Sequence, residues 1–180
     1  MTVDPHTILS GPQWHASLGT LAKEDVSRTL EATAEQRIAL ADALSVTRVD
    51  ALRAEVSVTA LDRGRVRVTG QVDATFEQAC VVSDAPVPTV ISEPINLILV
   101  PPETLSADGD AEAIELGALT DDEPLVEALS GDHVGLGRIV YETFAVAVPA
   151  FPRADGADLP ENVLASNRAA QQISPFAALA

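Results

Sequence analysis

The chain has 180 residues, of which 47% are hydrophobic, so it can bury the core of one domain and is not wholly disordered. Its formal net charge of −16 excludes nucleic-acid binding through the overall field, because phosphate contacts need lysine and arginine. One cysteine excludes an internal disulfide, and neither a signal peptide nor a long apolar span is predicted. We therefore expect a soluble cytoplasmic protein that contacts neither DNA nor a membrane.

The first helix is predicted after a flexible start over residues 1–11 and a short strand over residues 26–31. Thr33 and Gln36 have the spacing of a capping box, in which both side chains bond to free backbone N–H groups at a helix N-terminus. They predict a helix over residues 34–44. We expect its buried positions to include Ile38, Ala41 and Leu44.

The strongest pattern is a strict alternation of apolar and polar residues in "LRAEVSVTA" (52–60) and "VRVTGQVDATF" (66–76). Period-two alternation is typical of strands that bury one face. The intervening "DRG" (62–64) has turn chemistry. These segments predict a long antiparallel hairpin with one face on the core and the other in solvent.

A third strand is predicted over residues 90–100, where Pro94 indicates an edge or a bend because proline cannot donate a ladder hydrogen bond. Apolar residues at helical spacing predict a second helix over residues 136–148, which Pro149 ends. The fold class is therefore α+β: an antiparallel sheet built on the hairpin, with two packed helices. The alternation fits an open sheet as well as one curled into a barrel.

One α+β domain is predicted over residues 12–153, interrupted by an acidic insert. Residues 101–132 contain ten Asp or Glu residues and no Lys or Arg, and their mutual repulsion favours a mobile loop. Residues 154–180 read as a flexible tail that ends in the apolar cluster "SPFAALA".

Few residues carry recognisable chemistry. His6, His15 and His133 have no second ligand at metal spacing, so we expect exposed or loop histidines, and neither a metal nor another cofactor is expected. No nucleotide-binding or nucleophile-elbow motif occurs, and no Ser or Cys has an evident His partner, so we expect no enzymatic activity. Cys80 is interpreted as a small, partly buried hydrophobe.

The basic residues are concentrated in the first part of the chain, where eight of the eleven precede residue 71. Arg53, Arg65 and Arg67 fall on the polar side of the hairpin and are candidates for contact with RNA phosphates. The alternative is an ordinary solvated face, on which these arginines pair with Glu55 and Asp73. No interleaved aromatic residues offer a stacking platform for bases.

The order of the motifs resembles the YceD-like family of large ribosomal RNA subunit accumulation proteins. The helix "TAEQRIALADAL", the hairpin and turn as far as "ACVVSDAPV", the acidic insert, "VGLGRIVYETFAVAVPAFPR" and the closing "SPFAALA" carry this resemblance over residues 12–180. Many members have Cys-x-x-Cys, an acidic residue and proline after the hairpin. Cys80 and Pro86 match that motif, whereas Ser83 replaces the second cysteine. One thiolate cannot hold zinc, so no metal role is carried over.

The resemblance implies a non-enzymatic role in the accumulation or processing of the large-subunit (23S) ribosomal RNA of bacteria. Two mechanisms follow from the residues. The protein could bind ribosomal RNA through the three hairpin arginines, or it could act as an acidic chaperone or adaptor for a basic ribosomal protein. A small enzyme is the least favoured interpretation, and the oligomeric state is left open.

Overall fold

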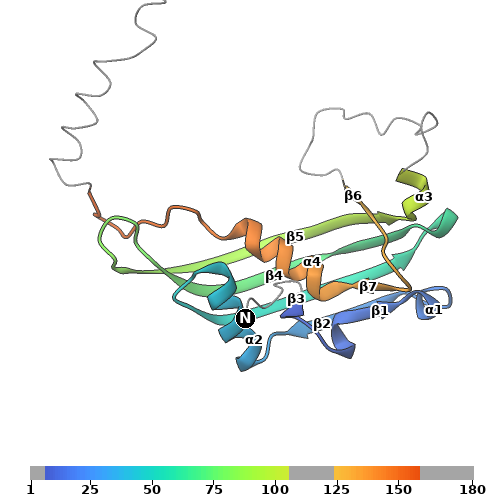
Figure 1. Cartoon of the computed structure of the whole chain (residues 1–180), viewed down its shortest axis with the longest axis horizontal. Coiled ribbons are helices and arrows are strands. Elements are labelled where there is room, and N and C mark those ends of the chain that lie inside the picture. The colour runs from blue at the N-terminus through green and yellow to red at the C-terminus, as the bar shows by residue number, and fades with distance from the viewer. Residues whose placement is uncertain (1–6, 106–123, 159–180) are drawn as a thin grey trace, which may run out of the picture.

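A five-stranded sheet forms the centre of the protein, whose computed structural model describes residues 7–105 and 124–158. The strands lie in the order β2-β3-β4-β5-β6, and neighbours are antiparallel except for the parallel pair β5–β6 (Figure 1). The sheet is open and does not close into a barrel. Its strands are β2 (Val26–Glu31), β3 (Arg48–Ala60), β4 (Val66–Ala79), β5 (Pro86–Val100) and β6 (Leu125–Ala128).

The predicted hairpin is confirmed and consists of β3 and β4, joined by the 3-10 turn η3 (Asp62–Gly64). Val58 lies opposite Val68, and both side chains are fully buried. The predicted third strand is also confirmed as β5, which begins earlier than expected, at Pro86. Most apolar residues of these three strands face the same side of the sheet, where they form most of the core.

Both predicted helices are present. α2 (Ala34–Leu44) begins with the predicted capping box, in which the Gln36 N–H donates to Thr33 Oγ1 over 3.2 Å. The prediction of its buried side was wrong in part: Ile38 is 72% exposed, and Leu40 is the fully buried residue. α2 packs against β3, and Leu40 is its buried residue. The few apolar residues of this helix did not show which of its sides would face the core.

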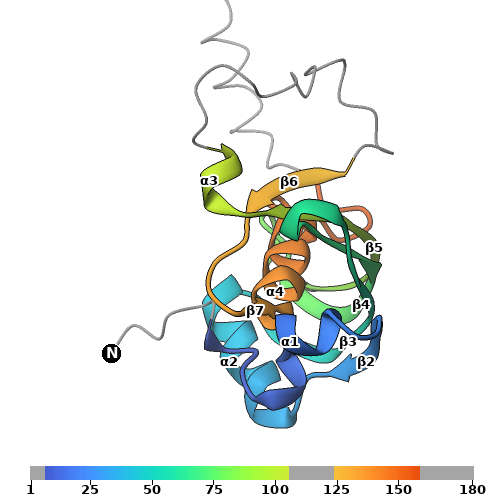
Figure 2. The same ribbon diagram turned by 90° about the vertical axis from the view of Figure 1, so that its right-hand side faces the viewer.

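The second helix, α4 (Leu136–Ala147), lies across the inner face of the sheet (Figures 1 and 2). Phe144 on α4 and Phe76 on β4 meet edge to face, with ring centroids 5.3 Å apart. Both side chains are fully buried, and such pairs stabilise a core beyond their buried area. No helix in the described part of the chain is long and apolar enough to cross a bilayer.

The N-terminal segment packs beside α4 on this face. It contains η2 (Pro12–Trp14), β1 (His15–Ser17) and the single turn α1 (Leu18–Leu21), and β1 pairs with β7 (His133–Gly135) just before α4. Part of the predicted flexible start differs from expectation, because Ile8 and Leu9 are buried in the core. Two isolated apolar residues have no periodicity by which a sequence could reveal this.

The acidic insert is partly ordered. α3 (Pro102–Leu105) begins it, and β6 falls within the predicted loop, where it pairs in parallel with the end of β5. The prediction of a loop over residues 101–132 was therefore wrong at β6. Four residues are too few to establish a period, and their partner strand is distant in sequence. Most of the insert, residues 106–123, and the predicted tail from residue 159 lie outside the described residues.

On the side away from β4, β5 pairs with β6 only at residues 97–100, and its prolines lie on the rest of this edge. Cys80 N–H donates to the Ala85 carbonyl at one end of the β4–β5 hairpin, and Leu129 N–H donates to the Val100 carbonyl at the opposite end. Odd-numbered residues of β5 thus direct their backbone groups to β4, and even-numbered residues direct theirs away from it. Three even positions are prolines. These are Pro86, Pro88 and Pro94, so the edge predicted at Pro94 is confirmed.

Candidate functional site

The three candidate arginines all lie on the outer face or the end of the β3–β4 hairpin, but they do not form one cluster. Arg67 lies opposite Thr59, six residues along β3 from Arg53, which is roughly 20 Å at strand spacing. Charges this far apart are screened from one another at physiological salt. The structure brings Arg65 and Arg67 together near the turn and leaves Arg53 apart.

Arg53 is surrounded by carboxylates. Its Nη2 lies 2.5 Å from Glu55 Oε1, and its register partners are Asp73 on β4 and Glu31 on β2. Arg65 and Arg67 make weaker local contacts: Arg65 Nε donates to the Asp62 carbonyl over 3.2 Å, and Arg67 Nη2 donates to Asn96 Oδ1 over 3.4 Å. The outer face is therefore mixed in charge at Arg53 and basic only near the turn.

The rest of the outer face is a network of short polar side chains. Ser27 and Ser57 hydroxyls bond across β2 and β3 over 3.0 Å, and Gln71 Nε2 donates to Ser92 Oγ over 2.7 Å. The Ser92 hydroxyl in turn donates to Asp73. Four of the described aromatic side chains are buried in the core on the opposite face: Trp14, Phe76, Tyr141 and Phe144. Thus the described outer face offers hydroxyls and amides, and no ring on which a base could stack.

Cys80 lies at the start of the turn between β4 and β5, and its side chain is buried. A hydrogen bond from the backbone of Ala154 lowers the pKa of the Cys80 thiol to about 7, with further contributions from the Ser83 hydroxyl and the Val82 N–H. The Val82 N–H donates to Cys80 Sγ over 3.4 Å, and Ser83 stands at the position of the missing second cysteine.

This turn is joined to the segment that follows α4. Val81 N–H donates to the Pro152 carbonyl over 3.0 Å, and the buried Gln78 donates its Nε2 to the Pro149 carbonyl over 2.9 Å. Pro86, the third motif position, begins β5 directly after the turn. The motif positions therefore lie in a turn that is hydrogen-bonded to the segment after α4.

Two histidines that are distant in sequence meet in the structure. The rings of His15 and His133, on the paired strands β1 and β7, are 4.7 Å apart between centroids and nearly perpendicular. His133 Nδ1 lies 2.9 Å from the exposed Asp132, and this hydrogen bond lowers the pKa of the Asp132 carboxyl. His6 lies outside the described residues. Among those described, no group of three His, Cys, Asp or Glu side chains could hold a metal ion.

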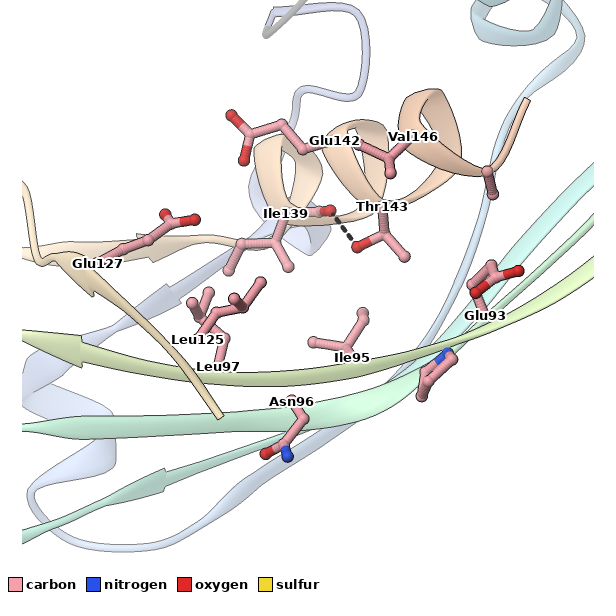
Figure 3. A pocket seen from close by; sticks show the side chains of 12 residues that line it. Glu93, Ile95, Asn96, Leu97, Leu125, Glu127, Ile139, Glu142, Thr143 and Val146 are labelled. Atoms are coloured by element: carbon pink, nitrogen blue, oxygen red, sulfur yellow. Dashed lines mark hydrogen bonds between the residues drawn. The ribbon is translucent and has the colours of Figure 1, made fainter. Parts of the chain in front are cut away.

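An apolar groove of about 480 Å³ lies between α4 and β5. Sequence reasoning missed it, because it depends on which flank of α4 other elements leave uncovered. The apolar side chains converge on it from three elements (Figure 3). They are Ile95 and Leu97 of β5, Leu125 of β6, and Ile139, Val146 and Ala147 of α4. Val146 is 88% exposed and Leu125 is 65% exposed, whereas Ile95, Leu97 and Ile139 are buried and form the base of the groove.

The polar groups around this groove are acidic. Glu93, Glu127 and Glu142 line it, and no Lys or Arg does. Arg138, just outside, bridges Glu127 at 2.8 Å and Glu142 at 3.0 Å. Three carboxylates and one guanidinium give this rim a net charge of −2. Thr143 turns its hydroxyl back to the Ile139 carbonyl of its own helix, over 2.8 Å (Figure 3).

Comparison with known proteins adds one match. No curated protein and no solved structure matches the chain. The family described as "Large ribosomal RNA subunit accumulation protein YceD" matches residues 68–180, which is more than half of the chain. The matched part contains Cys80, Ser83, Pro86 and the whole groove, whereas Arg53, Arg65 and Arg67 precede it. The protein therefore belongs to the YceD family of large ribosomal RNA subunit accumulation proteins.

Proposed function

We propose that this protein is a non-enzymatic ribosome-biogenesis factor that supports the accumulation or processing of 23S ribosomal RNA in the bacterial cytoplasm. Membership of the YceD family is the observation that carries this proposal. The chemistry of the fold supports the non-enzymatic part. The one thiol is buried in a turn, and its hydrogen-bond partners are backbone groups and a serine rather than a histidine that could act as a base.

Of the two mechanisms, the geometry favours an adaptor for a basic ribosomal protein over direct RNA binding. The candidate arginines are split, and carboxylates surround Arg53. By contrast, the acidic rim and the apolar groove lie together, and the chain carries a net charge of −16. A basic protein is the partner that such a field attracts, whereas RNA is repelled by most of this surface.

The function is tested in cells that lack the protein, by measuring the ratio of large-subunit to small-subunit ribosomal RNA. We expect the wild-type chain and the Cys80→Ser variant both to restore this ratio. Failure of the wild-type chain to change it would overturn the proposed function. Restoration by wild type with no restoration by Cys80→Ser, at equal protein level, would instead indicate chemistry at the thiol.

The mechanism is tested with Arg65→Glu/Arg67→Glu. The adaptor proposal predicts that this variant still restores the ratio and still co-purifies with the same ribosomal proteins. If the variant loses large-subunit RNA, and if wild-type RNA association falls steeply with salt, direct RNA binding is the mechanism. Arg28→Glu is not a suitable control, because Arg28 braces the Pro12 and Gln13 carbonyls. Arg153→Glu, in the segment after α4, is the better one.

A further inference from the structure

We propose that the groove between α4 and β5 is the docking site for a basic amphipathic helix of a protein partner. The inference rests on the adaptor form of the proposed function and adds the place, the conformation and the chemistry of the partner segment. Three observations carry it: the stripe of groove-lining residues on α4, the prolines on the backbone edge of β5, and the charge around the groove.

The flank of α4 that lines the groove has the form of a helix-packing surface. Its groove-lining residues are 139, 142, 143, 146 and 147, which are spaced i, i+3, i+4, i+7 and i+8 and therefore form one stripe along the helix. Val146 is the most exposed large apolar side chain of the described residues. Side chains of a second helix can pack between the ridges of such a stripe, with Ile95 and Leu97 as the floor.

An added β-strand is the other common occupant of a groove beside a sheet edge, and the prolines argue against it. Strand addition needs backbone donors and acceptors along the edge. Pro86, Pro88 and Pro94 occupy even positions of β5, whose backbone groups face outward, so the edge lacks the N–H at each of them. A helix satisfies its own backbone hydrogen bonds and needs none from this edge.

The charge around the groove selects a basic partner. The rim has a net charge of −2, and the Glu93 carboxylate has no ion pair within the described part of the chain. A helix with apolar residues on one side and Lys or Arg on the other complements the apolar groove and its acidic rim.

The test uses the full chain and a labelled peptide of about 18 Leu and Lys residues at amphipathic helical spacing, with a Leu and Glu peptide of the same pattern as the charge control. Binding is measured by fluorescence anisotropy. We expect the Leu/Lys peptide to bind and the Leu/Glu peptide not to bind. Val146→Lys should weaken binding about tenfold or more, through the loss of one apolar contact and the added repulsion.

The matched control is Val90→Lys, which makes the same substitution away from the groove, on the outer face of β5, at a valine that is 76% exposed. It should weaken binding less than about twofold. Glu93→Lys should likewise weaken binding more than Glu24→Lys, at an exposed loop residue before β2. Equal effects of either pair would mean general charge attraction and would overturn the docking site. So would equal binding of both peptides.

A photo-crosslinking amino acid at position 146 tests the other occupants in cells. Crosslinks to a Lys- or Arg-rich helix of another protein support the proposal. Crosslinks to residues 159–180 of the same chain, or to a second copy, would overturn it. The result is separable from the proposed function: if Val146→Lys fully restores the ribosomal RNA ratio while wild type also does, the docking site is wrong and the function stands.

Discussion

Gly137 on α4 lies directly against the backbone carbonyl of Leu9. A Cβ atom at position 137 would fall far inside contact distance of the Leu9 oxygen, and also close to the Leu9 carbonyl carbon. Both residues are buried. The N-terminal segment can therefore pack on α4 only because position 137 has no side chain, and this contact fixes the helix over the inner face of the sheet.

We expect Gly137→Ala to destabilise the protein by about 2 kcal/mol. Alanine is the better helix former, but the backbone of residue 9 must move to admit the methyl group, and overpacking of this kind costs more than the propensity gains. Urea unfolding measures the change. The control is Gly135→Ala, because a Cβ there would have Arg138 Cβ, at 4.0 Å, as its nearest neighbour. A Gly137→Ala variant as stable as the Gly135→Ala variant would contradict the close packing.

The capping box at α2 gives a second prediction. Thr33 Oγ1 accepts from the Gln36 N–H, and the Thr33 N–H donates to Gln36 Oε1 over 3.0 Å. We expect Thr33→Ala to lower the free energy of unfolding by about 1 kcal/mol, because one helix N–H loses its acceptor. Thr33→Ser keeps the hydroxyl and should stay close to wild type. If the two variants were equally unstable, the hydroxyl would have no part in the effect.

Cys80 makes stability depend on pH. Its pKa in the folded protein is about 7, below the ordinary value of 9.0, mainly because the Ala154 backbone bonds to the sulfur. A lowered pKa means that folding favours the thiolate, so the gain is complete above pH 9 and disappears as pH falls through 7. We expect the difference in urea midpoint between wild type and Cys80→Ser to increase from pH 7 to pH 9. A constant difference over that range would show that folding does not lower the pKa of the thiol.

The sequence predicted the elements that depend on interactions between residues close together in the chain, and it did not predict those that depend on distant partners. Thr33 and Gln36 are three residues apart, and Val58 and Val68 are joined by a short turn, so local patterns defined α2 and the hairpin. By contrast, β6 pairs with a strand more than twenty residues away, and Ile38 is exposed because of where α2 rests on β3. No local pattern contains this information.

The candidate sites show the same contrast between local and distant interactions. The prediction that Arg53, Arg65 and Arg67 lie outside the core is confirmed: strand parity orients Arg53 and Arg67, and Arg65 lies at the turn just before β4. The carboxylates around Arg53 come from neighbouring strands, whose register the sequence does not give. Predicting the groove would require the tertiary arrangement of β5, β6 and α4, which form its walls. It would also require knowing that no other described element covers it.

The last prediction concerns the prolines on the open edge of β5. Because the backbone nitrogens of Pro88 and Pro94 face away from β4, they interrupt the row of donors that could pair with the edge of a second molecule. We expect Pro88→Val/Pro94→Val to restore two edge N–H groups and to increase self-association, measured by sedimentation velocity over a range of concentrations. The control is Ser92→Val, on the same edge and face, which adds a valine without adding an N–H. If the control associates as strongly as the double variant, side-chain hydrophobicity rather than the missing donors governs the edge. If neither associates more than wild type, the prolines do not protect it.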